Sequence, residues 1–260
     1  MFEKNRLSGK VALITGATSG IGKACAEKFA KLGMKLILTG RRENMLVQLK
    51  DHLKEKYNSD VYILTLDARD GKKVKATIES LPEEWKSIDI LVNNAGTIRR
   101  APLLEYKEED WQAVMDINLN AVYHLSQKVA KIMVEQKSGK IINIASMLSF
   151  QGGKFVPPYT ASKHGVAGLT KAFANELAAY NIQINAIAPG YIETANTAPI
   201  RADENRNNEI LSRIPCERWG KVQDLMGTVV FLASKASDYV NGHILAVDGG
   251  WSVSYTHLRA

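Results

Sequence analysis

Cysteine is scarce in this sequence of 260 residues, which holds 2 of them, Cys25 and Cys216. Two isolated cysteines cannot form the disulfide framework that stabilises many secreted proteins. The opening residues 1–6 are mostly polar or charged and lack the apolar core of a secretion signal. Together these absences favour a reducing compartment, and we expect the protein to be cytoplasmic.

Long apolar runs and metal-ligand patterns are missing as well. No apolar stretch approaches the roughly 18 residues that a membrane-spanning helix needs, and no G-x-S-x-G turn offers the nucleophile of a hydrolase. The histidines do not have the mutual spacing of metal ligands, and neither cysteine accompanies a histidine in a zinc-binding pattern. The histidines are His52, His124, His164, His243 and His257. We expect no membrane association and no catalytic metal.

Acidic residues are under-represented in one part of the chain only. The first hundred residues hold 19 Lys and Arg against 12 Asp and Glu, whereas the rest hold 15 of each, so the net charge of +7 comes from the first part. A nucleic-acid binder has such a surplus, but no zinc-finger spacing, RNP motif or long basic run accompanies it. We expect no nucleic-acid partner. A field that attracts a polyanionic cofactor and a merely solvated surface both stay open.

Short apolar runs rich in β-branched residues alternate with longer segments of helical period. This alternation is typical of repeated βαβ units around a parallel sheet, whose strands are covered on both faces and therefore lack polar alternation. We predict an α/β fold, a single doubly wound Rossmann domain with a seven-stranded parallel sheet and helices on both faces. The predicted strands are residues 11–15, 35–39, 61–66, 88–93, 140–144, 183–188 and 244–247. The predicted helices are residues 22–32, 42–57, 72–81, 108–136, 159–181 and 222–233.

Residues 191–221 interrupt this alternation, because they contain no strand candidate. Long connections of this kind usually form lids or binding loops, and ligands bind at the carboxyl ends of the strands in this architecture. We therefore predict a substrate lid over residues 191–221, within a single domain of residues 1–254. Residues 255–260 follow a finished strand and turn, and we interpret them as a non-native tail.

A glycine-rich turn, Thr-Gly-Ala-Thr-Ser-Gly-Ile-Gly at residues 15–22, connects the first strand to the first helix. Glycines let the backbone turn sharply and approach a pyrophosphate, while free N–H groups at the start of a helix stabilise its negative charge. The spacing is G-x-x-x-G-x-G, not the more usual G-x-G-x-x-G. The position of the turn between strand and helix predicts a dinucleotide site.

The end of the second strand carries arginine where a fold that binds NAD usually has an acidic residue for the ribose 2′-hydroxyl. Arg41 and Arg42 stand there, and guanidinium groups bind a 2′-phosphate through charge-assisted bonds. NADP(H) is therefore the preferred cofactor, with NAD(H) as a second choice. The alternative is that both arginines only begin a solvated helix. Asp67 and Ala68, at the end of the third strand, are placed to meet the adenine.

From residue 7 to residue 251 the sequence resembles the short-chain dehydrogenase/reductase family. The motifs that carry the resemblance stand in the family's order and spacing. They are the turn at residues 15–22, Asn93-Asn94-Ala95-Gly96, Asn118, Ser146, Tyr159-x-x-x-Lys163 and Pro189-Gly190. The resemblance implies a nicotinamide-dependent oxidoreductase, usually a homotetramer or homodimer built on the helices over residues 120–136 and 159–181.

The resemblance also assigns roles to individual residues. It implies a catalytic group of Asn118, Ser146, Tyr159 and Lys163, in which Ser146 binds the substrate oxygen and Asn118 holds a water that links Lys163 to solvent. The expected cofactor contacts are Gly16, Thr18, Ser19, Gly20, Ile21, Gly22, Arg41, Arg42, Asp67, Ala68, Asn93, Ala95, Gly96, Tyr159, Lys163, Pro189, Gly190, Ile192 and Thr194.

Tyr159 and Lys163 lie four residues apart and so share one face of a helix. A nearby ammonium group favours the phenolate, so we expect Lys163 to lower the pKa of Tyr159. Tyr159 would then act as general acid in ketone reduction or as general base in alcohol oxidation.

The two parts of the chain resemble different branches of the family. Residues 97–251 are similar to sugar-acid dehydrogenases of the 2-dehydro-3-deoxy-D-gluconate type, and residues 7–96 to NADP-dependent 3-hydroxy-acid (serine-type) dehydrogenases. An acidic substrate needs a cationic anchor, and we expect Arg99, Arg100 or Arg201, together with Ser146, to bind it. The alternative is that these arginines contact solvent, cofactor or another subunit.

The first hypothesis is thus an NADP(H)-dependent oxidoreductase that acts on a keto or hydroxyl group of a sugar acid. The alternatives are a 3-hydroxy-acid dehydrogenase, a reductase of uronate-derived ketoses, and a catalytically silent sensor of NADP. A sensor has no need of a proton relay, so the presence of Tyr159 and Lys163 argues against the last.

Overall fold

Seven short apolar strands form one parallel sheet in the computed structural model, which describes residues 7–254. The strands are β1 (Val11–Thr15), β2 (Lys35–Gly40), β3 (Val61–Thr65), β4 (Ile90–Asn93), β5 (Gly139–Ile144), β6 (Ile182–Pro189) and β7 (Ile244–Val247). Their order is β3-β2-β1-β4-β5-β6-β7, and every neighbouring pair is parallel. The predicted fold class is confirmed, because all seven predicted strands are present and belong to a single sheet.

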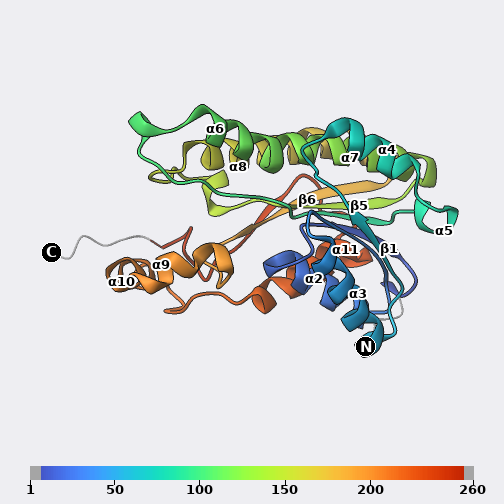
Figure 1. The fold of residues 1–260 in the computed structure, drawn as a ribbon, viewed down its shortest axis with the longest axis horizontal. Coiled ribbons are helices and arrows are strands. Elements are labelled where there is room, and N and C mark those ends of the chain that lie inside the picture. Colours follow the sequence, from blue (N-terminus) through green and yellow to red (C-terminus); the bar gives the residue numbers. More distant parts are fainter. Residues whose placement is uncertain (1–6, 255–260) are drawn as a thin grey trace.

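Helices cover both faces of this sheet (Figure 1). On one face lie α4 (Gly71–Glu79), α6 (Glu108–Met115), α7 (Ala121–Gln136) and α8 (Pro157–Leu177), and on the other α2 (Gly20–Lys31), α3 (Glu43–Tyr57) and α11 (Met226–Ala233). Three shorter α-helices are α5 (Glu83–Lys86), α9 (Ala198–Ala202) and α10 (Glu204–Leu211).

Strand β1 alternates its side chains between two of the three apolar cores. Ala12 and Ile14 of β1 point into the core with α2, α3 and α11, whereas Val11 and Leu13 point into the core with α4, α7 and α8. All of β1 is buried. An uninterrupted apolar strand is the expected consequence of having both faces covered.

The predicted helix over residues 108–136 is helical throughout, but it is not α-helical throughout. A single turn of π-helix over Asp116–Asn120 separates α6 from α7. The wider turn leaves Asn118 buried, with 1% of its surface exposed. Apolar periodicity does not report such a turn, because the period of the flanking helices continues on either side.

The connection over residues 191–221 contains no strand, as predicted, but it does contain α9 and α10. In Figure 1 these two helices lie at one end of the molecule, apart from the helices that cover the sheet. One isolated bridge between Ile192 and Gly220 brings the two ends of the connection together. The interpretation of residues 255–260 as a tail concerns residues outside those described.

No helix within residues 7–254 combines the length and apolar character needed to cross a membrane.

Candidate functional site

A cleft of about 450 Å³ lies beyond the carboxyl ends of the strands. Its lining includes the ends of β2, β5 and β6, the residues that follow β1, β3 and β4, and the start of the connection after β6. The strand order turns back between β1 and β4, which is where ligands bind in doubly wound sheets. The cleft therefore lies where the topology predicts a binding site.

The glycine turn of residues 15–22 forms one wall of the cleft, and two of its glycines have no room for a side chain. Gly16 has a φ of +63°, and a Cβ there would lie 2.9 Å from Ala95 Cα. At Gly22 a Cβ would lie 2.4 Å from both the Asn94 side chain and the Gly16 carbonyl oxygen. Asn94 fixes the turn by donating from Nδ2 to the carbonyls of Thr15 and Gly16, at 2.9 and 3.1 Å.

Helix α2 begins directly behind this turn, with Ser19 as its N-cap residue and no side chain on the first N–H groups. A helix start of this kind presents free N–H donors and a partial positive charge. These residues fit a dinucleotide pyrophosphate, because the backbone is open to close approach and the donors are unoccupied.

Three arginines stand at the outer end of the cleft, beyond β2 and β3. Arg42 donates to Thr18 Oγ1 at 2.9 Å, and Arg41 lies close enough to Asp67 to lower the pKa of its carboxyl group. The largest cause of that lowered pKa is a hydrogen bond from Arg69. Sequence reasoning missed Arg69, although its position two residues after Asp67 at a strand end was a usable signal.

Ser146, Tyr159 and Lys163 come together at the inner end of the cleft. Ser146 follows β5 and accepts a hydrogen bond from the Leu148 N–H at 3.1 Å, while the other two side chains come from the first turns of α8. The Lys163 ammonium donates to the Ile144 carbonyl at 2.6 Å and lies 5.6 Å from the centre of the Tyr159 ring. The predicted juxtaposition of phenol and ammonium is therefore present.

The expected effect of Lys163 on Tyr159 was wrong. Burial raises the pKa of Tyr159 above its ordinary value, and the influences that lower it are a hydrogen bond with Ser146 and the charge of Arg100. Burial also lowers the pKa of Lys163, to about 8. The ammonium bonds a backbone carbonyl, so desolvation decides both shifts. Tyr159 consequently keeps its proton at neutral pH.

The comparisons with known proteins agree with this geometry. The family model described as short chain dehydrogenase matches residues 10–205. The chain belongs to the short-chain dehydrogenase family. It is 54% identical to the 2-dehydro-3-deoxy-D-gluconate 5-dehydrogenase of Bacillus subtilis over 94% of this chain and 95% of that protein. The enzyme of the same name from Escherichia coli is 51% identical, over 94% and 96%.

A solved structure of a gluconate 5-dehydrogenase from Burkholderia cenocepacia, in complex with NADP and tartrate, has the same fold. It matches with a TM-score of 0.92 and 39% identity, over 97% of this chain and 99% of that one. The similarity to the two sugar-acid dehydrogenases extends over 94% of this short-chain dehydrogenase and so is not confined to residues 97–251.

Most of the predicted site residues line the cleft at the strand ends. Four of them do not: Gly22, Asn93, Asn118 and Arg201. Gly22 is buried beneath the turn. Asn93 donates from Nδ2 to the side chains of Ser126 and Asn143 inside the fold, at 2.9 and 2.8 Å, so its amide faces away from a cofactor.

Asn118 occupies the π-helical turn and is held by the backbone of Thr97. Its Oδ1 accepts from the Thr97 N–H at 2.8 Å, and its Nδ2 donates to the Thr97 carbonyl at 2.9 Å. Nδ2 also donates to Ser162 Oγ at 3.3 Å, and Ser162 in turn donates to the Tyr159 carbonyl at 2.8 Å. Asn118 therefore connects the turn to the first part of α8.

The three predicted anchor arginines have different surroundings. Arg99 lines the cleft but forms an ion pair with Asp110 at 3.3 Å. Arg201 points its guanidinium toward the Thr194 carbonyl at 3.5 Å and does not line the cleft. Arg100 lines the cleft, and its charge reaches Tyr159.

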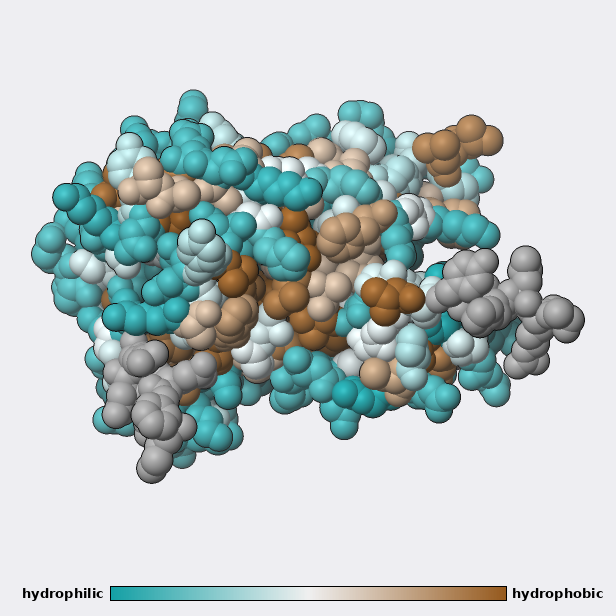
Figure 2. Space-filling view, turned by 180° about the vertical axis from the view of Figure 1, so that it is seen from behind, coloured by the Kyte–Doolittle hydropathy of each residue, from teal (hydrophilic) through white to brown (hydrophobic). Residues whose placement is uncertain are grey.

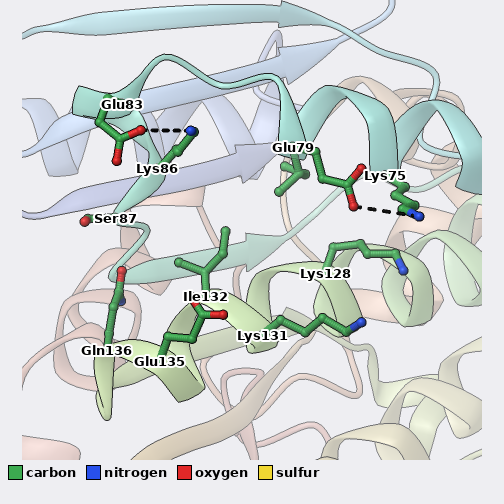
Figure 3. A pocket seen from close by; sticks show the side chains of 11 residues that line it. Lys75, Glu79, Glu83, Lys86, Ser87, Lys128, Lys131, Ile132, Glu135 and Gln136 are labelled. Atoms are coloured by element: carbon green, nitrogen blue, oxygen red, sulfur yellow. Dashed lines mark hydrogen bonds and ion pairs between the residues drawn. The ribbon is translucent and has the colours of Figure 1, made fainter.

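A second hollow, of about 570 Å³, lies between α4, α5 and α7 (Figure 3). Its rim carries the ion pairs Lys75–Glu79 and Lys86–Glu83, with N–O distances of 3.9 and 2.8 Å. None of the predicted site residues lines it. The chemistry therefore belongs to the cleft at the strand ends. Within residues 7–254 no three His, Cys, Asp or Glu side chains gather as a metal site requires.

Proposed function

We propose that this protein transfers a hydride between NADP(H) and a keto or hydroxyl carbon of a sugar acid of the 2-dehydro-3-deoxy-gluconate type. The observation that carries the proposal is the grouping of Tyr159, Lys163 and Ser146 at the inner end of a cleft whose outer wall is a glycine turn. The dehydrogenases of that name to which the chain is similar support the choice of substrate class.

The residues of the cleft fit a phosphorylated dinucleotide. Gly16 and Gly22 leave the turn open to a pyrophosphate, and Arg41 and Arg42 are exposed beside Thr18, where a 2′-phosphate needs cations. When bound, NADP(H) supplies or takes up the hydride. The structure of the B. cenocepacia gluconate 5-dehydrogenase, which holds NADP, supports this cofactor.

The raised pKa of Tyr159 suits the direction of ketone reduction. A phenol that keeps its proton at neutral pH is ready to donate it to the substrate oxygen, on which negative charge develops as the carbonyl carbon is reduced. Ser146, beside Tyr159, is placed to donate a second hydrogen bond to the same oxygen. In the direction of oxidation, Tyr159 has to lose its proton first, and the hydrogen bond with Ser146 and the charge of Arg100 favour that loss because both lower the pKa of Tyr159.

Arg100 is the anchor that we assign to the substrate carboxylate. It lines the cleft near Tyr159, whereas Asp110 already neutralises Arg99. A guanidinium binds a carboxylate through two parallel hydrogen bonds. The related gluconate 5-dehydrogenase was solved with tartrate, which is itself a hydroxy acid.

The decisive experiment follows the absorbance of NADPH and of NADH separately against keto sugar acids and 3-hydroxy acids. We expect turnover with NADPH and a keto sugar acid. In Tyr159→Phe, kcat falls at least about 100-fold, as is usual when a general acid is removed, while NADPH binding persists. Turnover of 3-hydroxy acids alone, or full activity of the Tyr159→Phe variant, contradicts the proposal.

Replacement of Arg100 separates anchoring from general effects of charge. Arg100→Met should raise KM for the acidic substrate roughly 30-fold, since a charge-assisted bond contributes about 2 kcal/mol. Arg99→Met is the matched control: it removes the neighbouring exposed arginine of the same cleft and should leave KM within about threefold. If the two variants raise KM equally, Arg100 is not the specific anchor of the substrate carboxylate.

We also propose that the protein is a cytoplasmic homo-oligomer, a tetramer or dimer formed through α7 and α8. Tyr123 of α7 and Tyr180, just after α8, are exposed. Tyr123 also packs against Phe173 of α8, with ring centres 6.2 Å apart. Figure 2 shows apolar side chains near the middle of the rear face, with hydrophilic ones around them. Exposed apolar side chains are often covered by self-association, and the choice of α7 and α8 rests on Tyr123 and Tyr180 rather than on the area in Figure 2.

A further inference from the structure

Four polar side chains are buried between the sheet and the helices α7 and α8. Asn93 on β4, Asn143 on β5, Ser126 on α7 and Thr170 on α8 expose 4%, 0%, 1% and 0% of their surfaces. Apolar residues of similar size would fill this space without the desolvation penalty of an amide. Such a group of polar residues needs a reason other than packing.

The hydrogen bonds of this group lead from the sheet to α8. Asn93 Nδ2 donates to Asn143 Oδ1 at 2.8 Å, and Asn143 Nδ2 donates to Thr170 Oγ1 at 2.9 Å. Thr170 Oγ1 donates to the Val166 carbonyl at 2.8 Å. The hydroxyl of Thr170 thus both accepts and donates, and the rotation of its O–H is fixed.

Thr170 and Lys163 attach the same helix to the same strand. The Lys163 ammonium donates to the carbonyl of Ile144, the residue next to Asn143. Thr170 lies seven residues after Lys163, which is about two helical turns, so both side chains face the sheet. Helix α8 is therefore held against β5 at two points, and one of them is a group of the proposed proton relay.

The other end of the network reaches the phosphate turn. Asn93 precedes Asn94, whose amide holds the carbonyls of Thr15 and Gly16. One chain of hydrogen bonds and adjacent residues thus runs from the turn at residues 15–22 across β4 and β5 to α8. Its two ends are the part of the cleft that would seat the cofactor and the helix that carries Tyr159.

We propose that the Asn143–Thr170 hydrogen bond fixes the register of α8 against β5, and that both are positioning residues for Tyr159 and Lys163. This inference rests on the proposed function, because it concerns how the Tyr159 phenol and the Lys163 ammonium are aligned with a bound nicotinamide. Because hydrogen bonds have short, directional optima, a polar contact sets register more sharply than an apolar contact does.

The test uses Thr170→Val, which keeps the shape of the side chain but cannot accept the hydrogen bond from Asn143. We expect kcat to fall about tenfold while KM for NADPH and for the substrate stays within twofold, and Thr170→Ser to recover most of kcat. Ser126→Ala is the matched control, since it removes another buried hydrogen bond of the same network that does not reach α8. Its kcat should stay within twofold.

A second measurement does not depend on turnover. The titration of the Tyr159 phenol is followed in the ultraviolet with NADP⁺ present, as the difference between each protein and the same protein with Tyr159→Phe. We expect Thr170→Val to shift the midpoint of this titration, and Ser126→Ala to leave it unchanged. If no sugar acid is turned over, the proposed function fails and this titration still decides the positioning. If Thr170→Val does not fold, Thr170→Cys, whose thiol accepts only weakly, should show the same change at smaller size. Equal kcat values and equal midpoints in the Thr170 and Ser126 variants would overturn the inference.

Discussion

Lys163 is an ammonium group inside the protein, and its burial has a consequence for stability. Its folded-state pKa of about 8 lies below its ordinary value of 10.5. Below pH 8 the group is charged in both the folded and the unfolded state, so the desolvation penalty, about 3 kcal/mol, destabilises the fold in full. Between pH 8 and 10.5 the unfolded state binds more protons, and this group's contribution to stability rises with pH.

We therefore expect Lys163→Met to be inactive but more stable. At pH 7 its free energy of unfolding should exceed that of the wild type by about 2 kcal/mol, after allowing about 1 kcal/mol for the Ile144 carbonyl left without its partner. Urea unfolding without cofactor measures this. The gain should shrink as the pH rises above 8. A less stable variant at pH 7 would show that the hydrogen bond to Ile144 outweighs desolvation.

The arginines at the outer end of the cleft should decide the choice between NADPH and NADH. Arg42→Ala and Arg41→Ala each remove a guanidinium from the expected 2′-phosphate position, at a loss of about 2 kcal/mol or a roughly 30-fold higher KM for NADPH. KM for NADH should hardly change. Steady-state kinetics with each cofactor gives the ratio of the KM for NADPH to the KM for NADH in each variant. A parallel rise for both cofactors would place these arginines elsewhere than on the 2′-phosphate.

At the scale of the element, the glycine turn has no room for a side chain at Gly22. Gly22→Ala places a methyl group against the Gly16 carbonyl oxygen and the Asn94 amide, and overpacking of this kind costs about 3 kcal/mol. We expect a lower melting temperature and loss of NADPH binding, measured by scanning calorimetry and by fluorescence titration.

Gly227 in α11 supplies the control for that prediction. A Cβ added there would have no heavy atom within 4 Å, so Gly227→Ala should stabilise the protein by about 0.5 kcal/mol through helix propensity. NADPH binding should be unchanged. If Gly22→Ala and Gly227→Ala have the same melting temperature and the same NADPH affinity, the packing around Gly22 is looser than the distances indicate.

Elements also differ in how well the sequence predicts them. The strands and α2 follow from uninterrupted apolar runs and a glycine turn, because neighbouring residues determine these features. The π-helical turn at residues 116–120 does not follow, because Asn118 is held there by the backbone of Thr97, which is far away in sequence. Periodicity in one segment carries no information about such a partner.

At the scale of the whole molecule, self-association through α7 and α8 can be tested with two matched surface positions. Tyr123 on α7 and Val47 on α3 are each 39% exposed, but α3 lies on the opposite layer (Figure 1). Tyr123→Glu should reduce the mass in sedimentation equilibrium, because a carboxylate would be buried in the interface. Val47→Glu should not change it. The same mass for Tyr123→Glu and the wild type would exclude this face.

The sequence by itself determined the positions of the strands along the chain, the position of the glycine turn and the identity of the residues around Tyr159. Each of these is encoded locally, by apolar period, by residue type or by spacing along one helix. Only the tertiary structure decided which charged side chains are paired with an opposite charge and which titratable groups are desolvated. It pairs Arg99 with Asp110 and leaves Arg100 beside Tyr159. It also buries Tyr159 and Lys163 enough that desolvation, which depends on every element packed around them, overrides the attraction expected from their spacing.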